Sequence, residues 1–102
     1  MKTKERQLRV FKALADETRL GIVEFLLKGE KCVCKIHPHV ERTQPTVSIQ
    51  LAKLERFGIV KRRRDGRYMF YSIADPAVRD VIGSFKKKIK RCDYGRKKRG
   101  EE

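Results

Sequence analysis

Acidic residues are scarce in this chain of 102 residues, which has 13 Asp and Glu against 27 Lys and Arg and a formal net charge of +14 at pH 7. A domain with such an excess of one sign repels itself unless an anionic partner neutralises it. The charge therefore favours a nucleic acid as partner, with an anionic membrane surface as the other class. A heat-adapted protein would explain the abundance of charge but not its sign.

Long apolar runs are also missing. No stretch approaches the roughly 20 apolar residues of a membrane-spanning helix, and the charged start MKTKERQLRVF is not followed by the apolar segment of a signal peptide. Cysteine is limited to three residues, an odd number that argues against a framework of disulfides. We therefore expect a cytoplasmic protein whose thiols are reduced.

Catalytic motifs are absent as well. The sequence has no carboxylate cluster with metal-binding spacing, no glycine-rich phosphate loop and no nucleophile motif, so we do not expect an enzyme. The length suits one domain. We predict this domain over residues 1–91, followed by a basic tail without fixed structure over residues 92–102.

Helical periodicity and capping residues organise most of the chain. Apolar spacing predicts a short helix over 4–14, and Asp16 and Gly29 mark the start and the end of a second one. The segment 32–40 contains Pro38, which limits it to about two helical turns. The predicted helix over 44–57 starts after Thr43 as N-cap and stops at Gly58. A last helix opens at Asp75-Pro76, and its apolar stripe consists of Val78, Val81, Ile82, Phe85 and Ile89.

Between the last two helices the period changes to two. Residues 59–64 and 67–73 flank Asp65-Gly66, a strong signal for a β-hairpin. A short helix, a tight turn, a second helix and then a hairpin form a helix-turn-helix with a wing. We therefore predict a mainly α fold with a two-stranded β-hairpin, in the order α-α-α-α-β-β-α.

The helix predicted over 44–57 has an apolar edge and an opposite face of mixed chemistry. The apolar edge consists of Val47, Leu51 and Leu54. The 100° step of a helix places on the opposite face Pro45, Thr46, Ile49, Lys53 and Arg56. A hydroxyl, an apolar branch and two cations suit base edges, thymine methyl groups and phosphates. Gln44, at the end that enters the groove first, suits adenine, and Ser48 and Gln50 flank the face within reach of bases or phosphate.

The predicted hairpin adds a cluster of cations at its tip. These are Lys61, Arg62, Arg63, Arg64 and Arg67. Cations at a loop tip suit a minor groove or flanking phosphates, and we select Arg62, Arg64 and Arg67 as DNA-binding residues.

Three passages resemble the ArsR/SmtB family of winged helix-turn-helix metalloregulatory transcription repressors. They are ALADETRLGIVEFL at 13–26, KCVCKI at 31–36 and TQPTVSIQLAKLERFGIVKRRRDGRYMFYSI at 43–73. With the flanking helices, the resemblance covers about residues 5–90. It implies a homodimer paired through its first and last helices, which represses promoters on double-stranded DNA with a palindromic operator and leaves that operator when a metal binds.

The resemblance also implies a thiolate site at Cys32 and Cys34 for As(III), Sb(III), Cd(II) or Pb(II), as effectors that the fold does not require. Soft thiolates select such ions. Residues i and i+2 lie about 200° apart on a helix, so both thiols meet one ion only if the chain is extended at Cys32. His37 and Cys92 are both candidates for the third ligand, and the all-sulfur set with Cys92 suits As(III) better.

The sequence departs from the family pattern at several positions. Gln50 stands where His is usual, Lys35 where Asp is frequent, and His37 where arsenic-responsive members carry Cys. A second metal site at the last helix is not expected, because Ala77 lacks a ligand group and no His follows His39. The alternatives are a thiol redox-sensing repressor, a repressor whose cysteines are only structural or vestigial, and a non-specific architectural protein. The last would show little preference for one DNA site.

Overall fold

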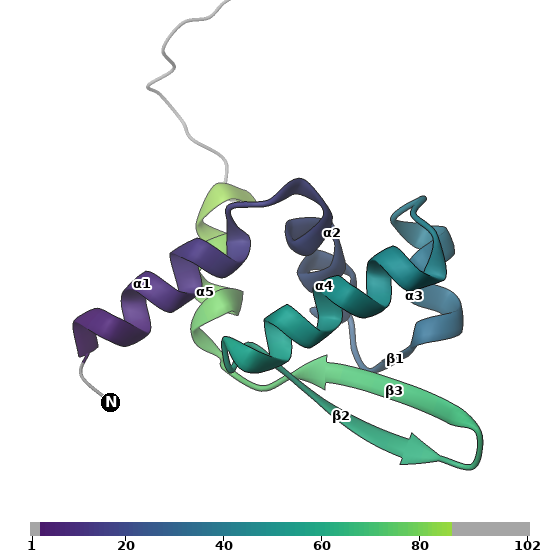
Figure 1. Cartoon of the computed structure of the whole chain (residues 1–102). Coiled ribbons are helices and arrows are strands. Elements are labelled where there is room, and N and C mark those ends of the chain that lie inside the picture. Colours follow the sequence, from purple (N-terminus) through teal and green to yellow (C-terminus); the bar gives the residue numbers. More distant parts are fainter. Residues whose placement is uncertain (1–2, 87–102) are drawn as a thin grey trace, which may run out of the picture.

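Helices dominate the computed structural model, which describes residues 3–86 of the chain. In chain order its elements are α1 (Thr3–Leu14), α2 (Glu17–Leu26), β1 (Lys31–Cys32), α3 (Val33–His39), α4 (Gln44–Arg56), β2 (Val60–Asp65), β3 (Tyr68–Ile73) and α5 (Ala77–Lys86). Helix α4 crosses the middle of the molecule, α1 and α5 lie at one end, and the tip of the β2–β3 hairpin lies at the other (Figure 1). The predicted mainly α fold with a winged helix-turn-helix is confirmed.

The core forms where α2, α3 and α4 meet the base of the hairpin. Its fully buried side chains are branched and apolar: Ile22, Val23, Leu26, Ile36, Val47, Leu51, Leu54, Ile59 and Val78. The apolar edge predicted for α4 is thus confirmed, with all three of its members at 0% exposure. Burying side chains of this size stabilises a fold by about 1.5–3 kcal/mol each, so α4 is held with its opposite face outward.

The predicted caps fix where the helices begin and end. The Asp16 side chain accepts a hydrogen bond from the Arg19 N–H (3.0 Å), and the Thr43 hydroxyl accepts one from the Thr46 N–H (3.3 Å). Gly58 ends the turn after α4 with φ of +80°, a conformation that glycine adopts without steric cost. These local signals place the start of α4 directly after the short turn that follows α3.

The hairpin differs from the prediction by one residue at its tip. Asp65 pairs with Tyr68, so the two residues of the turn are Gly66 and Arg67 rather than Asp65 and Gly66. Gly66 takes φ of +66°, and glycine at the first central position is typical of a type II′ hairpin turn. Arg67 therefore projects from the extreme end of the wing.

A third strand, β1, was not predicted. Lys31 pairs with Tyr71 and Cys32 pairs with Phe70, which gives the antiparallel sheet the order β1-β3-β2. A strand of two residues is too short to show an alternating pattern. It nevertheless joins the cysteine segment directly to the wing.

An ion pair joins α1 to Asp75, just before the start of α5. Arg6 donates two hydrogen bonds to the Asp75 carboxylate, at 3.2 and 2.7 Å, and the Ala77 N–H donates a third at 2.9 Å. The Asp75 side chain is only 14% exposed. The hydrogen bond from Arg6 is the main cause that holds the pKa of Asp75 below its ordinary value.

Some predictions fall on residues 87–102, which lie outside the described residues. They are Ile89 in the apolar stripe of the last helix, the end of the domain at residue 91, and the tail over residues 92–102.

We predict that Asp75→Ala lowers the free energy of unfolding by about 1–2 kcal/mol at neutral pH, because it removes a helix cap and leaves Arg6 without its partner. The folded pKa is depressed, so this stabilisation is present above the unfolded pKa of about 3.9 and is lost as pH falls through the folded pKa. Urea denaturation at a series of pH values measures both effects. Asp80→Ala, which changes an exposed carboxylate of the same helix, is the control. An equal loss in the two variants would contradict the prediction.

Candidate nucleic-acid interface

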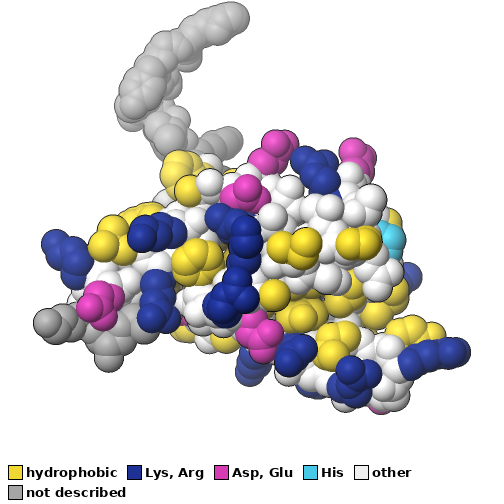
Figure 2. Space-filling model, in the orientation of Figure 1, with side chains coloured by type: hydrophobic (Ala, Val, Ile, Leu, Met, Phe, Trp, Pro, Cys, Tyr) yellow, Lys and Arg dark blue, Asp and Glu magenta, His cyan; other side chains and the backbone are white. Residues whose placement is uncertain are grey.

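The outward face of α4 combines apolar, polar and cationic side chains. Ile49 is 58% exposed although it is a large apolar residue. Pro45 and Arg56 are exposed and Lys53 is half-buried on the same side. In Figure 2, hydrophobic side chains on the visible face of α4 lie next to a band of Lys and Arg. An isolated apolar side chain among cations suits contact with a thymine methyl group beside phosphates.

The N-terminal end of α4 presents Gln44 and Ser48, which are both exposed. Thr46 is half-buried, and its hydroxyl accepts a hydrogen bond from the Thr43 hydroxyl at 3.0 Å. Part of its hydrogen-bonding capacity is therefore used by the helix cap. Gln44 and Ser48 are the polar side chains of this end with the freest approach to a groove.

Gln50 is half-buried and its side chain is bound within the protein, whereas the sequence predicted it within reach of bases or phosphate. Its Oε1 accepts a hydrogen bond from Arg19 Nη1 at 2.9 Å. The same guanidinium donates from Nε to the Ala13 carbonyl at 2.9 Å and lies 5.8 Å from the Phe57 ring centre. Arg19 thereby links the end of α1, the start of α2 and the middle of α4. Gln50 serves first to position α4, which the sequence alone did not indicate.

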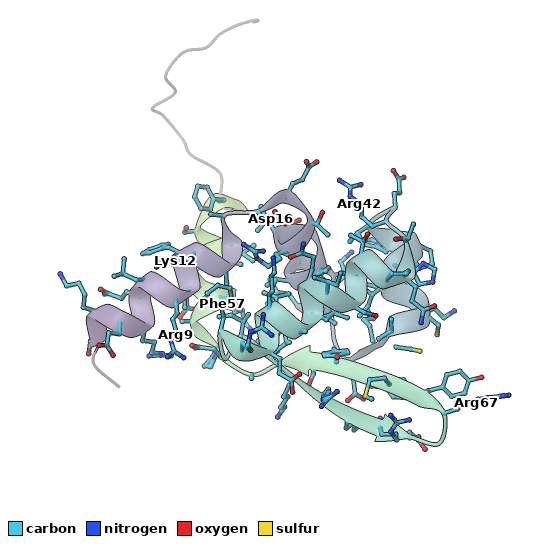
Figure 3. The ribbon with its side chains drawn as sticks, viewed as in Figure 1. Arg9, Lys12, Asp16, Arg42, Phe57 and Arg67 are labelled. Carbon is cyan, nitrogen blue, oxygen red and sulfur yellow. The ribbon has the colours of Figure 1, made fainter. Side chains whose placement is uncertain are left out.

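The wing cations fall into two groups. Arg62 pairs with Glu55 at 3.3 Å, and Arg63 pairs with Glu30 at 2.8 Å while its guanidinium lies 4.7 Å from the Phe70 ring centre. Lys61, Arg64 and Arg67 are exposed and make no ion pair with a carboxylate of residues 3–86. Figure 3 shows Arg67 extending from the hairpin tip. Arg64 and Arg67 thus agree with the predicted phosphate contacts, whereas Arg62 is already partly neutralised.

Two further cations, Arg9 and Lys12, which the sequence did not predict as DNA-binding residues, lie where α1 meets the end of α4. Arg9 and Lys12 of α1 lie close to Phe57 in this region (Figure 3), and they line a groove together with Lys53 and Arg56. The first helix was interpreted only through its apolar stripe. The spacing of Glu5, Arg9 and Lys12 at i, i+4 and i+7 was a signal for a polar edge on that helix.

The two described cysteines lie at the junction of β1 and α3. Cys32 is buried and extended (φ −76°, ψ 146°), and its Sγ accepts a hydrogen bond from the Cys34 N–H at 3.2 Å. Cys34 is exposed at the start of α3, and the neighbouring Cys32 thiol is the main cause that raises its pKa. The extended conformation at Cys32 satisfies the condition for two converging thiols.

Among the described residues, no third ligand lies beside this pair. His37 is half-buried on α3, and residues 3–86 contain no group of three or more His, Cys, Asp and Glu side chains arranged to hold a metal ion. Cys92 lies outside the described residues. The Asp75 carboxylate, just before the last helix, is bound by Arg6.

Comparisons with known proteins agree with this geometry. Residues 16–62 match the model of the bacterial regulatory protein arsR family. The HTH-type transcriptional regulator MJ1325 of Methanocaldococcus jannaschii is 42% identical over 83 residues, which cover 80% of this chain and 93% of that one. A probable mercury resistance operon repressor of Streptomyces lividans is 43% identical over 74 residues, covering 72% of this chain and 59% of that protein, so this chain spans under two thirds of its length.

Solved structures are similar as well. The homodimeric winged helix-turn-helix domain of Mb0332 from Mycobacterium bovis superposes with a TM-score of 0.73 at 32% identity, covering 81% of this chain and 77% of that one. None of the helices in residues 3–86 has the length and apolar character that a membrane crossing requires. The chain belongs to the arsR family of bacterial regulatory proteins, and its winged helix-turn-helix is that of a DNA-binding transcriptional regulator.

Proposed function

We propose that this protein represses transcription as a homodimer, with α4 of each protomer in successive major grooves of a palindromic operator, and that a thiophilic ion releases it. The observation that carries the DNA-binding part is the exposed face of α4, where Ile49 lies among cations while the opposite edge is fully buried. A helix held in this way presents base-reading side chains without further rearrangement.

We assign sequence reading and general affinity to different residues. Gln44 and Ser48, at the exposed N-terminal end of α4, read bases, whereas Arg64 and Arg67 on the wing bind phosphates, which carry no sequence information. We predict that Gln44→Ala or Ser48→Ala reduces the preference for the operator by about 1–3 kcal/mol. We predict that Arg64→Ala with Arg67→Ala weakens binding to all duplexes and flattens the salt dependence by about one to two units per protomer.

Fluorescence anisotropy at several salt concentrations, with an operator duplex and a scrambled duplex, separates the two effects. The operator duplex is first obtained by selection from a random pool. If both sets of variants behave alike, the assignment of roles is wrong. If the wild-type protein shows no preference for any duplex, the protein is a non-specific architectural protein rather than a repressor.

The apolar surface at the α1–α5 end supports a homodimer. Phe85 is 83% exposed and Phe11 57% exposed, and both line a groove between α1, α2 and α5 with Leu14, Leu20 and Val81. Large apolar side chains exposed together are typical of an interaction surface. The homodimeric state of the Mycobacterium bovis relative supports a second copy of this chain as the partner.

We predict that the protein sediments as a dimer at micromolar concentration and that Phe11→Asp with Phe85→Asp converts it to monomer, because the substitutions place charges in an apolar interface. Tyr68→Asp, which changes an exposed aromatic residue of the wing instead, is the matched control and leaves the dimer intact. A wild-type protein that sediments only as monomer would contradict the proposal.

The effector proposal rests on the two thiols at the start of α3. A thiol pair supplies the soft ligands that As(III), Sb(III), Cd(II) and Pb(II) prefer, and a relative is a probable mercury resistance repressor. A bound ion would draw both sulfurs toward one point and thereby distort the junction between β1 and α3. We propose Cys92 as the third sulfur for As(III), with His37 as the alternative for ions that accept imidazole.

The sheet offers a physical connection from these thiols to the wing. Cys32 is the register partner of Phe70 in β3, and Phe70 pairs with Arg63 of β2. Arg63 in turn binds Glu30, directly before β1, at 2.8 Å. A distortion at Cys32 therefore reaches the hairpin through paired backbone as well as α4 through the turn after α3. If this network of contacts has one arrangement with the ion bound and another without it, ion binding is coupled to DNA binding.

We predict that titrating the protein–operator complex with As(III), Sb(III), Cd(II) or Pb(II) under reducing conditions lowers operator affinity about five- to 150-fold for at least one ion, the usual range of allosteric coupling. Anisotropy of labelled operator measures the release. Release that persists in the Cys32→Ser, Cys34→Ser double variant would exclude these thiols from the mechanism. Release by oxidant alone, reversed by a dithiol and insensitive to all four ions, would indicate the redox-sensing alternative.

A further inference from the structure

A cationic groove lies between α1 and the C-terminal half of α4, beside the base-reading end of that helix. Its walls carry Arg9 and Lys12 from α1, Arg19 from α2, and Lys53, Arg56 and Phe57 from the end of α4. Glu5 is the acidic residue of its lining. We call this feature the basic groove. Five cations against one carboxylate around a shared space repel one another, so the groove suits an anionic ligand.

Most cations of the basic groove have no carboxylate partner within the described residues. Arg19 is engaged, because it donates hydrogen bonds to Ala13, Lys12 and Gln50. The other cationic side chains, those of Arg9, Lys12, Lys53 and Arg56, make no ion pair with a carboxylate within residues 3–86. Cations that join elements of this protein have polar partners, as Arg6, Arg19 and Arg63 show. The groove therefore holds charge that the folded domain itself does not require.

The basic groove continues the DNA-reading face of α4. Lys53 and Arg56 lie on the same side of that helix as Ile49, at i+4 and i+7 from it. In Figure 2, the band of Lys and Arg lies between α1 and the visible face of α4. A duplex that lies along α4 thus also passes over the mouth of the groove.

We propose that the basic groove binds the phosphates of the DNA backbone between the two half-sites of the operator, through Arg9 and Lys12 together with Lys53 and Arg56. This proposal rests on the proposed function, because the α1–α5 end is the dimer side and the DNA beside it is the centre of the operator. The exposure of Arg9, Lys12 and Arg56 favours a backbone passing over the groove rather than a small anion enclosed within it.

The test compares two double variants that each remove one Arg and one Lys. Arg9→Ala with Lys12→Ala removes the α1 wall of the groove, and Lys28→Ala with Arg79→Ala removes two exposed cations from the α2–α5 side. Binding to a duplex of scrambled sequence is measured by anisotropy across a series of salt concentrations. For the groove variant we expect log Kobs to depend less steeply on log[salt], by about two to four units per dimer, because each lost phosphate contact removes about 0.9.

The control variant is expected to keep the wild-type salt dependence. The charge-preserving exchange Arg9→Lys with Lys12→Arg is also expected to keep it, since phosphate contacts need charge more than one side-chain shape. Thermal melts confirm that each variant is folded. Equal salt dependence in the groove and control variants, while Arg64→Ala with Arg67→Ala still weakens binding, would overturn the proposal but leave the proposed function intact. Failure of wild type to bind any duplex would overturn both.

Discussion

The burial of one edge of α4 is the constraint on which the rest of the structure depends. Val47, Leu51 and Leu54 are fully enclosed between α2, α3 and the base of the hairpin, and truncating one such side chain costs a protein about 2–5 kcal/mol. Because these three residues fix the rotation of the helix, the opposite face cannot turn inward. The exposure of Ile49 is therefore a consequence of core packing rather than an accident of the surface.

The cations of the described residues have two different roles: some join elements of the fold, and others are exposed at the surface. Arg6, Arg19 and Arg63 join elements that are distant in sequence, and each has carboxylate or carbonyl partners. The exposed cations of the wing and of the basic groove lie at the two ends of α4, outside these joints. A duplex along α4 would thus meet base-reading side chains in the middle and phosphate-binding side chains on either side. Within the described residues, the cations that join elements are thus separate from the exposed cations that an anionic partner would neutralise.

The helix boundaries and the hairpin could largely be predicted from the sequence, because the residue patterns that mark them are local. The caps at Asp16 and Thr43, the glycine after α4 and the alternation of the hairpin each depend on a few adjacent residues. The contacts of Gln50 with Arg19 and of Glu30 with Arg63 join residues 31 and 33 positions apart, and no periodicity encodes them. Strand β1 was missed because its two residues are defined by their partners in β3. The basic groove was missed because its walls come from three separate helices.

The central claim is that α4, the wing and the basic groove form one continuous surface for DNA. Amide chemical-shift mapping of isotope-labelled protein, titrated with a duplex at low salt, tests it most directly. We expect shifts at the polar edge of α1 around Arg9, along α4 from Gln44 to Arg56, and at the wing tip around Arg67, with little change along the outer surface of α2. Shifts concentrated on α2 and α5, with α4 unchanged, would contradict it.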